Sequence, residues 1–414
     1  MAGWRHFLIV VSSASSLALA CFQPGHASEA DPPPLETVAD ELLSETPRIN
    51  TLLIEREFAL IGGRWGSDLF IDAPLNGEPE GAQVTLRRAK LWYARALGKH
   101  WSFKLSGDYT RGGGLEFSSN YLRYAGWDRT LLTLGITDPP FSQESVSDSG
   151  SLTFMETGLP VAALAERKSG GIAVLRRNPG SILNAAVILF NVGQDDLREE
   201  GQGVVMHYVH SPIEIGHQKS IHVGGSISYR WNATDEGSRF RTRPEVATVN
   251  DYFVDTGEIA GADRIGRVSI EASQVAGRFS WQTEWLAARV ERDDDTPVFF
   301  WGAYANLSWF LTKDSRNYNF GLGQFENVKV QSPLLQGGRG AFELAFRASC
   351  VDLSDKDVFG GSEINLSAGI NWYLNDRIRL MTNLVKVVDV NRPGSEFDGQ
   401  DPLIISLRAQ WVLN

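Results

Sequence analysis

The feature that most constrains this chain is a repeated alternation of apolar and polar side chains over segments about 8 to 14 residues long. The clearest segment is 364–374, INLSAGINWYL, and the pattern returns in 101–110, 298–311 and 403–413. Successive side chains of a β-strand point to opposite faces, so a period of two predicts strands and is not that of an amphipathic helix.

Roughly sixteen or seventeen segments share this pattern, each closed by Gly, Asn, Asp or Pro. They lie near 51–62, 82–97, 101–110, 117–125, 129–137, 168–177, 181–192, 202–211, 219–231, 264–276, 277–291, 298–312, 316–326, 339–352, 361–375, 376–389 and 403–413. Bacterial barrels use an even number of strands, so we expect one segment not to belong to the wall. The segments that fit least well are 117–125 and 202–211.

Two all-β architectures would show this alternation: a soluble set of β-sandwiches and a transmembrane barrel. The segments exceed the soluble average of about 5 or 6 residues and match the roughly 9 to 11 that cross a bilayer. Aromatic residues such as Trp101, Trp309 and Trp411 stand near the ends of the apolar faces, as in interfacial girdles. Connections alternate between short and long. The predicted fold class is therefore all-β, a transmembrane antiparallel β-barrel of about 16 strands.

One connection, residues 138–167, is too long and irregular to be a turn between strands. Prolines fix its bends, and its apolar content is too high for a disordered segment. The apolar residues are Phe141, Leu152, Phe154, Met155, Leu159, Val161 and Leu164. We expect this segment to fold into the lumen of the barrel.

The N-terminus predicts secretion. Arg5 and His6 precede an apolar run, and Gly25-His26-Ala27 offers a cleavage site, so residues 1–27 read as a signal peptide. Residues 28–48 are acidic and Pro-rich and predict a short periplasmic linker, which leaves 49–414 for the barrel.

Several chemistries are not supported by the sequence. The net charge of -11 and the lack of a basic block argue against nucleic acid. His207 and His210 would face opposite sides of a strand, so no metal site or cofactor is predicted. No Ser-centred elbow, P-loop or HExxH is present, and we expect no enzyme activity.

Short motifs follow one another in a characteristic order. They are LRRAK (86–90), WSFKL (101–105), PPFS (139–142), LTFME (152–156), GAFELA (340–345) and GINWYLN (369–375). Through these motifs the chain resembles the phosphate-selective porins O and P, from about Thr51 to its C-terminus.

The resemblance implies a sixteen-stranded barrel in the outer membrane of a Gram-negative-type bacterium, commonly a homotrimer in contact with the lipid bilayer. Its function would be passive diffusion of small anions such as phosphate or polyphosphate. The third extracellular loop, here 138–167, would form the constriction. The constriction residues would be Phe141, Thr153, Phe154, Met155 and Glu156.

Arginines from the wall and loops would then form a ladder for anions, because a fixed fork of donors replaces lost hydration and always stays charged. The candidates are Arg56, Arg87, Arg88, Arg239, Arg241 and Arg243. The last three alternate in SRFRTRP (238–244), so an extended segment would point them the same way. The alternatives for this run are a solvated loop face or a site for lipopolysaccharide phosphates.

Two pairs of charged residues raise geometric questions. Arg87 and Arg88 are adjacent, so they face opposite sides of a strand unless it bulges. Arg347 and Glu343 share one polar face, and we expect them in a wall network of paired charges.

The sequence departs from the family at the constriction, where Gly150 and Thr157 stand at positions that are basic in phosphate-selective members. This loss of positive charge leaves a second hypothesis open, a general or neutral-solute porin of the same fold. A third, from another class, is a soluble secreted β-rich binding protein.

Overall fold

The computed structural model describes residues 61–72, 83–110, 115–192, 200–211, 219–231, 238–293 and 296–413. All of them belong to the unit Ala39–Asn414. The predicted signal peptide (1–27) and linker (28–48) lie outside the described residues.

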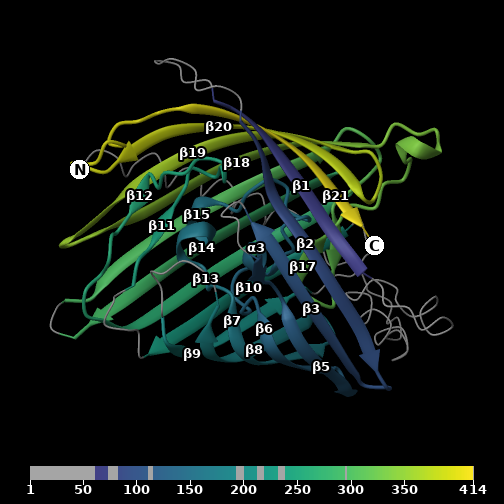
Figure 1. Cartoon of the computed structure of the whole chain (residues 1–414), viewed down its shortest axis with the longest axis horizontal. Helices are drawn as coiled ribbons and strands as arrows, with labels where there is room; N and C mark the ends of the chain where they lie inside the picture. The colour runs from purple at the N-terminus through teal and green to yellow at the C-terminus, as the bar shows by residue number, and fades with distance from the viewer. Residues whose placement is uncertain are drawn as a thin grey trace, which may run out of the picture. The chain divides into compact units, whose positions relative to one another are not determined.

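Seventeen strands form one antiparallel sheet, shown in Figure 1. They are β1 (Ile61–Asp72), β2 (Gln83–Leu97), β3 (Trp101–Thr110), β4 (Leu115–Phe117), β5 (Asn120–Trp127), β6 (Thr130–Thr137), β7 (Ser169–Asn178), β8 (Ser181–Asn191), β9 (Gln202–His210), β10 (Lys219–Trp231), β13 (Ala262–Ala276), β14 (Phe279–Arg292), β15 (Val298–Phe310), β18 (Ala341–Asp355), β19 (Val358–Tyr373), β20 (Ile378–Asn391) and β21 (Leu403–Leu413). Both β4 and β5 pair with β3, so they make one interrupted wall strand, and the described residues form a wall of 16 strands.

The sheet closes on itself. β1 pairs with β2 on one side, where Trp65 lies opposite Ala89, and with β21 on the other, where it lies opposite Trp411. Each remaining wall strand pairs with the strands before and after it. A sheet whose first and last strands pair encloses a barrel and leaves no open edge. The predicted fold class is confirmed.

The barrel is apolar outside and charged inside. On the inner face Arg230, Glu343 and Glu363 are completely buried, whereas on the outer face Ile270 and Phe346 are 59% and 58% exposed. Soluble domains show the reverse arrangement. An apolar outer band and a polar interior are what a lipid-embedded barrel requires.

Consecutive connections alternate between the two ends of the barrel. One end carries the short turns 98–100, 128–129, 179–180, 277–278 and 374–377 and one long connection, 311–340; the other carries the long connections 138–168, 232–261 and 392–402 and one short turn, 356–357. Short turns face the periplasm in such barrels. Residues 138–167, called the inward loop below, are therefore part of the third extracellular connection, as predicted. Strand β21 points toward the periplasmic end, on the right of Figure 1.

One strand prediction was wrong. The segment outside the wall is 316–326, not 117–125 or 202–211: β16 (Asn317–Asn319) and β17 (Gln324–Glu326) form a separate two-stranded sheet between β15 and β18. Its alternation resembles that of a wall strand, but a turn containing Gly323, with φ +72°, ends each arm after three residues. The predicted strand 51–62 lies outside the described residues except for its last two, which belong to β1, and the pairing of β1 with β21 continues through Asp72.

The helices of the described residues are short. They are α3 (Gln143–Val146), α4 (Leu159–Leu164) and the 3-10 turn η1 (Leu334–Gln336). None of the helices in this part of the chain is long and apolar enough to cross a membrane.

Candidate functional site

The inward loop lies inside the barrel. The side chains of Phe141, Leu159 and Leu164 are completely buried, and they join Leu286 and Phe300 of the inner wall in one apolar cluster. Pro160 in the first turn of α4 supplies a preset φ where a missing N–H costs nothing. The prediction that this segment folds into the lumen is confirmed.

The helix α3 is fixed to the wall through its first two backbone amides. Gln143 N donates to Glu271 Oε2 and Glu144 N to Glu284 Oε1, both at 2.7 Å. The Ser142 hydroxyl caps the same turn by accepting from Ser145 N. Wall carboxylates therefore accept hydrogen bonds from the backbone amides at the N-terminus of α3, which have no partner within the helix.

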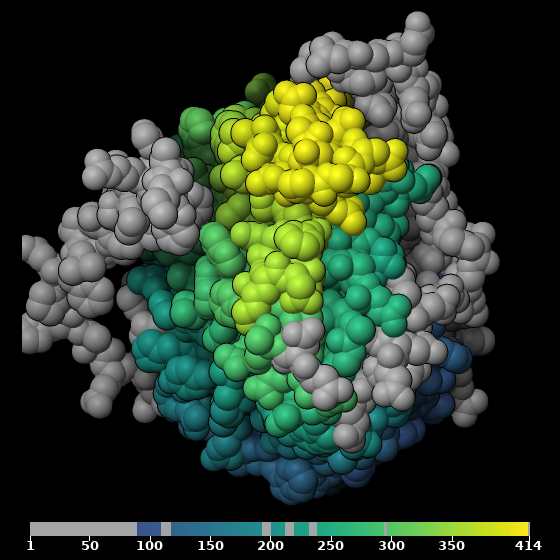
Figure 2. All heavy atoms as spheres, turned by 90° about the vertical axis from the view of Figure 1, so that its left-hand side faces the viewer, coloured from purple at the N-terminus to yellow at the C-terminus, as the bar shows by residue number. Residues whose placement is uncertain are grey.

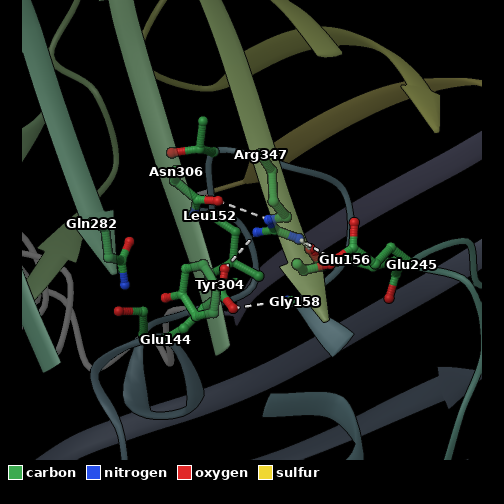
Figure 3. Close-up of polar contacts among 12 residues, drawn as sticks. Glu144, Leu152, Glu156, Gly158, Glu245, Gln282, Tyr304, Asn306 and Arg347 are labelled. Carbon is green, nitrogen blue, oxygen red and sulfur yellow. Dashed lines mark hydrogen bonds and ion pairs between the residues drawn. The ribbon is translucent and has the colours of Figure 1, made fainter. Parts of the chain in front are cut away.

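Glu144 returns the contact with its own side chain, as Figure 3 shows. Its carboxylate accepts from Arg347 Nη2 at 2.7 Å and from Gly158 N at 2.9 Å. Arg347 also donates from Nε to Asn306 Oδ1 at 2.8 Å and from Nη1 to the Glu156 carbonyl at 2.9 Å. Burial raises the pKa of Glu144 above its ordinary value, although Arg347 acts in the opposite direction.

The middle of the loop is held by two buried arginines. Arg379 donates to the carbonyls of Leu152 at 2.7 Å and Thr153 at 2.8 Å. Arg316 donates to the Ser151 carbonyl at 2.8 Å and to Thr153 Oγ1 at 2.5 Å. These backbone groups lie inside the barrel, where the arginines satisfy them in place of water.

The later part of the loop is held in the same way. Arg408 donates to the Met155 carbonyl at 2.5 Å and to Glu156 Oε1 at 2.7 Å. Glu166 forms ion pairs with Arg230 at 2.5 Å and Arg267 at 3.2 Å, all three being fully buried. The wall arginines thus connect the inward loop to the strands along most of its length.

Sequence reasoning missed most of these anchors. It expected Arg347 and Glu343 in a wall network of paired charges; the structure pairs Arg347 with Glu144 of the inward loop and with Glu245, while Glu343 bonds to Asn371 and Tyr373 of the wall. The anchors that it did not single out are Arg230, Arg267, Arg316, Arg379 and Arg408. All except Arg316 occupy inward positions of wall strands, and the alternation of polar and apolar side chains could have indicated this. Their partners in the loop, however, are remote in sequence.

Four of the five residues predicted at the constriction have side chains buried between loop and wall. Phe141, Thr153, Phe154 and Met155 are at most 7% exposed. The fifth, Glu156, has a side chain that is 21% exposed. Their role in a constriction stays a prediction.

A second segment, residues 238–261, also lies inside the barrel; we call it the lumen segment. It contains β11 (Arg241–Thr242) and β12 (Val254–Asp255), which pair with each other. Phe240 is completely buried, with its ring 5.4 Å from that of Phe300 on the inner wall. In Figure 2, which looks onto the extracellular end, green-teal residues of this region lie below the yellow residues near the C-terminus.

The three arginines of the lumen segment lie on one side, as their alternation predicts. Ser238, Phe240 and Thr242 are buried, whereas the arginines between and after them are partly exposed. Arg241 and Arg243 lie over the ring of Tyr252, at 4.0 and 4.4 Å from its centre. Such stacking helps to hold both guanidinium groups in place.

Arg239 forms an ion pair with Asp255. Burial acts to raise the pKa of Asp255, but hydrogen bonds from Arg239 and Gly257 N hold it below the ordinary value. The carboxylate is therefore charged at neutral pH and compensates Arg239.

The other predicted arginines can be placed only in part. Arg56 lies outside the described residues. Arg88 pairs with Gly66, and the register then shifts so that Arg87 has no partner on β1. The bulge that two adjacent arginines would need is present. Nothing is described of either side chain, so their place in the lumen stays a prediction.

A third segment enters from the periplasmic end, within residues 311–340. Tyr318 of β16 contacts His222 of the wall, OH to Nδ1 at 2.6 Å, and the Phe325 carbonyl of β17 accepts from Ser151 of the inward loop at 3.1 Å. Both His222 and His207 contact Glu271, and His210 points outward. No group of His, Cys, Asp or Glu in the described residues is arranged to hold a metal ion.

A closed, inside-out barrel whose lumen holds inward-folded segments defines a diffusion channel of the bacterial outer membrane. The sequence profile of the family "Phosphate-selective porin O and P" matches residues 60–413. The chain therefore belongs to this porin family and is an outer-membrane porin. The soluble secreted alternative is rejected.

Two curated relatives are similar in sequence. Porin O of Pseudomonas aeruginosa is 24% identical over 92% of this chain and 93% of its own length. An uncharacterized protein of Caulobacter vibrioides is 35% identical, but the match covers 40% of this chain and 34% of that protein.

Solved structures are similar in fold alone, at 8–12% identity. OprB of Pseudomonas putida covers 88% of this chain and 96% of its own, with a TM-score of 0.55. An anion-selective porin from Comamonas acidovorans covers 86% and 99%, with a TM-score of 0.54. The trimer form of OmpT from Vibrio cholerae covers 86% and 99%, with a TM-score of 0.50.

Proposed function

We propose that this porin passes small anions, oxyanions such as phosphate among them, by passive diffusion. The observation that supports the proposal best is the pair Arg241 and Arg243, both partly exposed on one side of the lumen segment and both stacked on Tyr252. An anion leaving bulk water needs fixed donors that attract it without trapping it. Two neighbouring guanidinium groups supply such donors near the extracellular entrance.

Membership in the family and the anion selectivity stated for the Comamonas porin agree with this proposal. The inward loop, by contrast, adds little positive charge, because the one basic residue within 138–167 is Arg167 at its end. The cations that select for anions would therefore come from the lumen segment and the wall rather than from the inward loop.

The test is a reversal-potential measurement on single channels in a planar bilayer under a potassium chloride gradient. We expect anion preference in the wild type. The double variant Arg241→Gln, Arg243→Gln should lower the anion-to-cation permeability ratio about fivefold or more, since about 1 kcal/mol is expected from one charge at 4 Å even in water. The control is Arg289→Gln, a 61% exposed side chain on the outer face. Cation preference in the wild type, or an unchanged ratio in the double variant, would contradict the proposal.

A second candidate function is a general or neutral-solute channel. It is favoured by the acidic and uncharged side chains that the inward loop leaves partly exposed, among them Asp148 and Thr157. Reversal potentials with phosphate and with chloride, together with swelling of liposomes in a sugar, separate the two functions.

We also propose a homotrimer, in line with the trimer form known for OmpT. Light scattering of the detergent-solubilised protein, corrected for bound detergent, would give its mass. A mass near that of a single 45.7 kDa chain would contradict the trimer. Contact with lipopolysaccharide stays a prediction.

A further inference from the structure

The two ends of the barrel carry opposite charge. For each end we compared the exposed charged side chains in its connections and in the four residues of each wall strand nearest that end. Only the described residues are counted. At the periplasmic end nine are basic and two acidic. The basic ones are Arg95, Lys99, Arg176, Lys219, Arg278, Lys313, Lys329, Arg339 and Arg377; the acidic ones are Asp128 and Asp376.

At the extracellular end the balance is reversed, with three basic and ten acidic side chains. The basic ones are Arg264, Arg289 and Lys356; the acidic ones are Asp138, Asp148, Asp251, Glu258, Asp293, Asp357, Asp389, Glu396, Asp398 and Asp401. The asymmetry cannot follow from the overall charge, because the chain as a whole is acidic.

Three of the periplasmic cations point outward toward lipid. Arg95, Arg176 and Lys219 are exposed, and each stands next to an inward residue: Ala94, Leu175 and Ser220 are at most 8% exposed. Adjacent residues of a strand face opposite sides, so these three cations lie on the outer face. We call them the basic rim.

Two of the three stand in rows with aromatic side chains of the outer face. Arg176 pairs with Thr130, and Arg176 Nη1 donates to Thr130 Oγ1 at 2.9 Å; Thr130 pairs in turn with Trp127, which is 54% exposed.

In the second row Lys219 pairs with Ala276, Ala276 with Phe279 and Phe279 with Trp309. Phe279 is 43% and Trp309 50% exposed. Aromatic rings of this kind sit at the level of lipid headgroups, and a neighbouring Lys or Arg can extend its cation to the phosphates there.

We propose that the basic rim binds the headgroups of anionic glycerophospholipids in the periplasmic leaflet. In each row a cation lies beside an aromatic ring that marks the level of the lipid headgroups. A lipid whose acyl chains are buried in the membrane holds its phosphodiester at this level, within reach of the cation. At the extracellular end Arg264 and Arg289 also stand opposite aromatic residues, Trp231 and Phe299, but both cations are within 3.8 Å of the Glu291 carboxylate, and Arg264 is 2.7 Å from Asp263 as well. Each Lys or Arg near an anionic surface contributes about fivefold in affinity, and the attraction is screened by salt.

The test uses the purified full-length protein in detergent, titrated with phosphatidylglycerol or phosphatidylcholine, with bound lipid counted by native mass spectrometry. We expect phosphatidylglycerol to be retained at least tenfold better. The triple variant Arg95→Gln, Arg176→Gln, Lys219→Gln should lose this preference. Its affinity for phosphatidylglycerol should fall by up to about a hundredfold, the product of three fivefold effects. Raising the salt concentration from about 0.05 to about 0.5 M should weaken the retention of phosphatidylglycerol and leave that of phosphatidylcholine unchanged.

The matched control replaces the three exposed cations of the other end, Arg264→Gln, Arg289→Gln and Lys356→Gln, and should change retention less than twofold. Circular dichroism verifies that each variant is folded. Equal retention of the two lipids overturns the proposal, as does an unchanged triple variant or an equal loss in the control. Complete displacement of phosphatidylglycerol by inorganic phosphate would show a site for free phosphate and overturns it too.

Discussion

Replacing Arg347 by methionine tests whether wall arginines hold the inward loop in place. The guanidinium is completely buried and donates to Glu144, Asn306 and the Glu156 carbonyl at 2.7–2.9 Å. Methionine fills much of the same volume but donates no hydrogen bond. The variant therefore leaves the buried Glu144 carboxylate without this cation.

The expected cost follows from that carboxylate. Removing one partner of a buried ion pair costs about 3–5 kcal/mol, because the other charge remains buried. Glu144 can reduce this cost by taking up a proton, and burial has already raised its pKa. We therefore expect Arg347→Met to lower the free energy of unfolding by about 3–5 kcal/mol near pH 8 and by less near pH 5.

The assay is reversible urea unfolding of the barrel in lipid vesicles, followed by tryptophan fluorescence. Adding Glu144→Gln to Arg347→Met removes the buried charge and should recover about 1–3 kcal/mol, the usual coupling of residues in contact. The surface variant Arg289→Gln should stay within about 0.5 kcal/mol of the wild type. A loss below about 1 kcal/mol for Arg347→Met, or a double variant no more stable than the single one, would refute the argument.

Two further predictions use the same assay. Gly302→Ala should destabilise the barrel by about 1–3 kcal/mol, because its Cβ would lie 2.6 Å from the Cys350 carbonyl oxygen and 2.8 Å from Pro160 Cβ of the inward loop. The control is Gly266→Ala, whose Cβ would have open space around it. Equal destabilisation by the two substitutions would count against close packing at Gly302. Because the folded-state pKa of Glu144 is raised, its contribution to stability is full below the unfolded pKa and is lost as pH rises through the folded value. Glu144→Gln should remove this part of the pH dependence of the free energy of unfolding. An unchanged pH profile would show that Glu144 does not cause it.

Alternation predicted the wall well because a barrel strand faces two different media over its whole length. In β15 and β19 the predicted outward residues are the exposed ones, and Asn306 and Asn371 point inward as expected. The same rule was wrong for 316–326, since Tyr318 and Phe325 also alternate with polar neighbours. A short hairpin enclosed by the barrel meets two environments as well, and periodicity alone cannot tell which environment is lipid.

The candidate site could be predicted only where the signal was local. The arginines at 239, 241 and 243 are two residues apart, so their common side followed from the backbone geometry. The contact of Arg379 with Thr153 joins residues 226 apart in sequence. The sequence alone does not show whether a lone arginine on a polar strand face binds ions or anchors a loop, and the fold was needed to show that its donors are taken.

The positions of these arginines bear directly on how selectivity can arise. An arginine in the lumen attracts ions only if its charge reaches the water path, and Arg230, Arg267 and Arg347 are completely buried with carboxylates beside them. Their charge is compensated inside the protein and stabilises the inward loop. Counting the lumen arginines of this porin therefore overestimates its anion preference. The proposed function assigns the contact with a passing anion to Arg241 and Arg243, which are partly exposed and stacked on Tyr252.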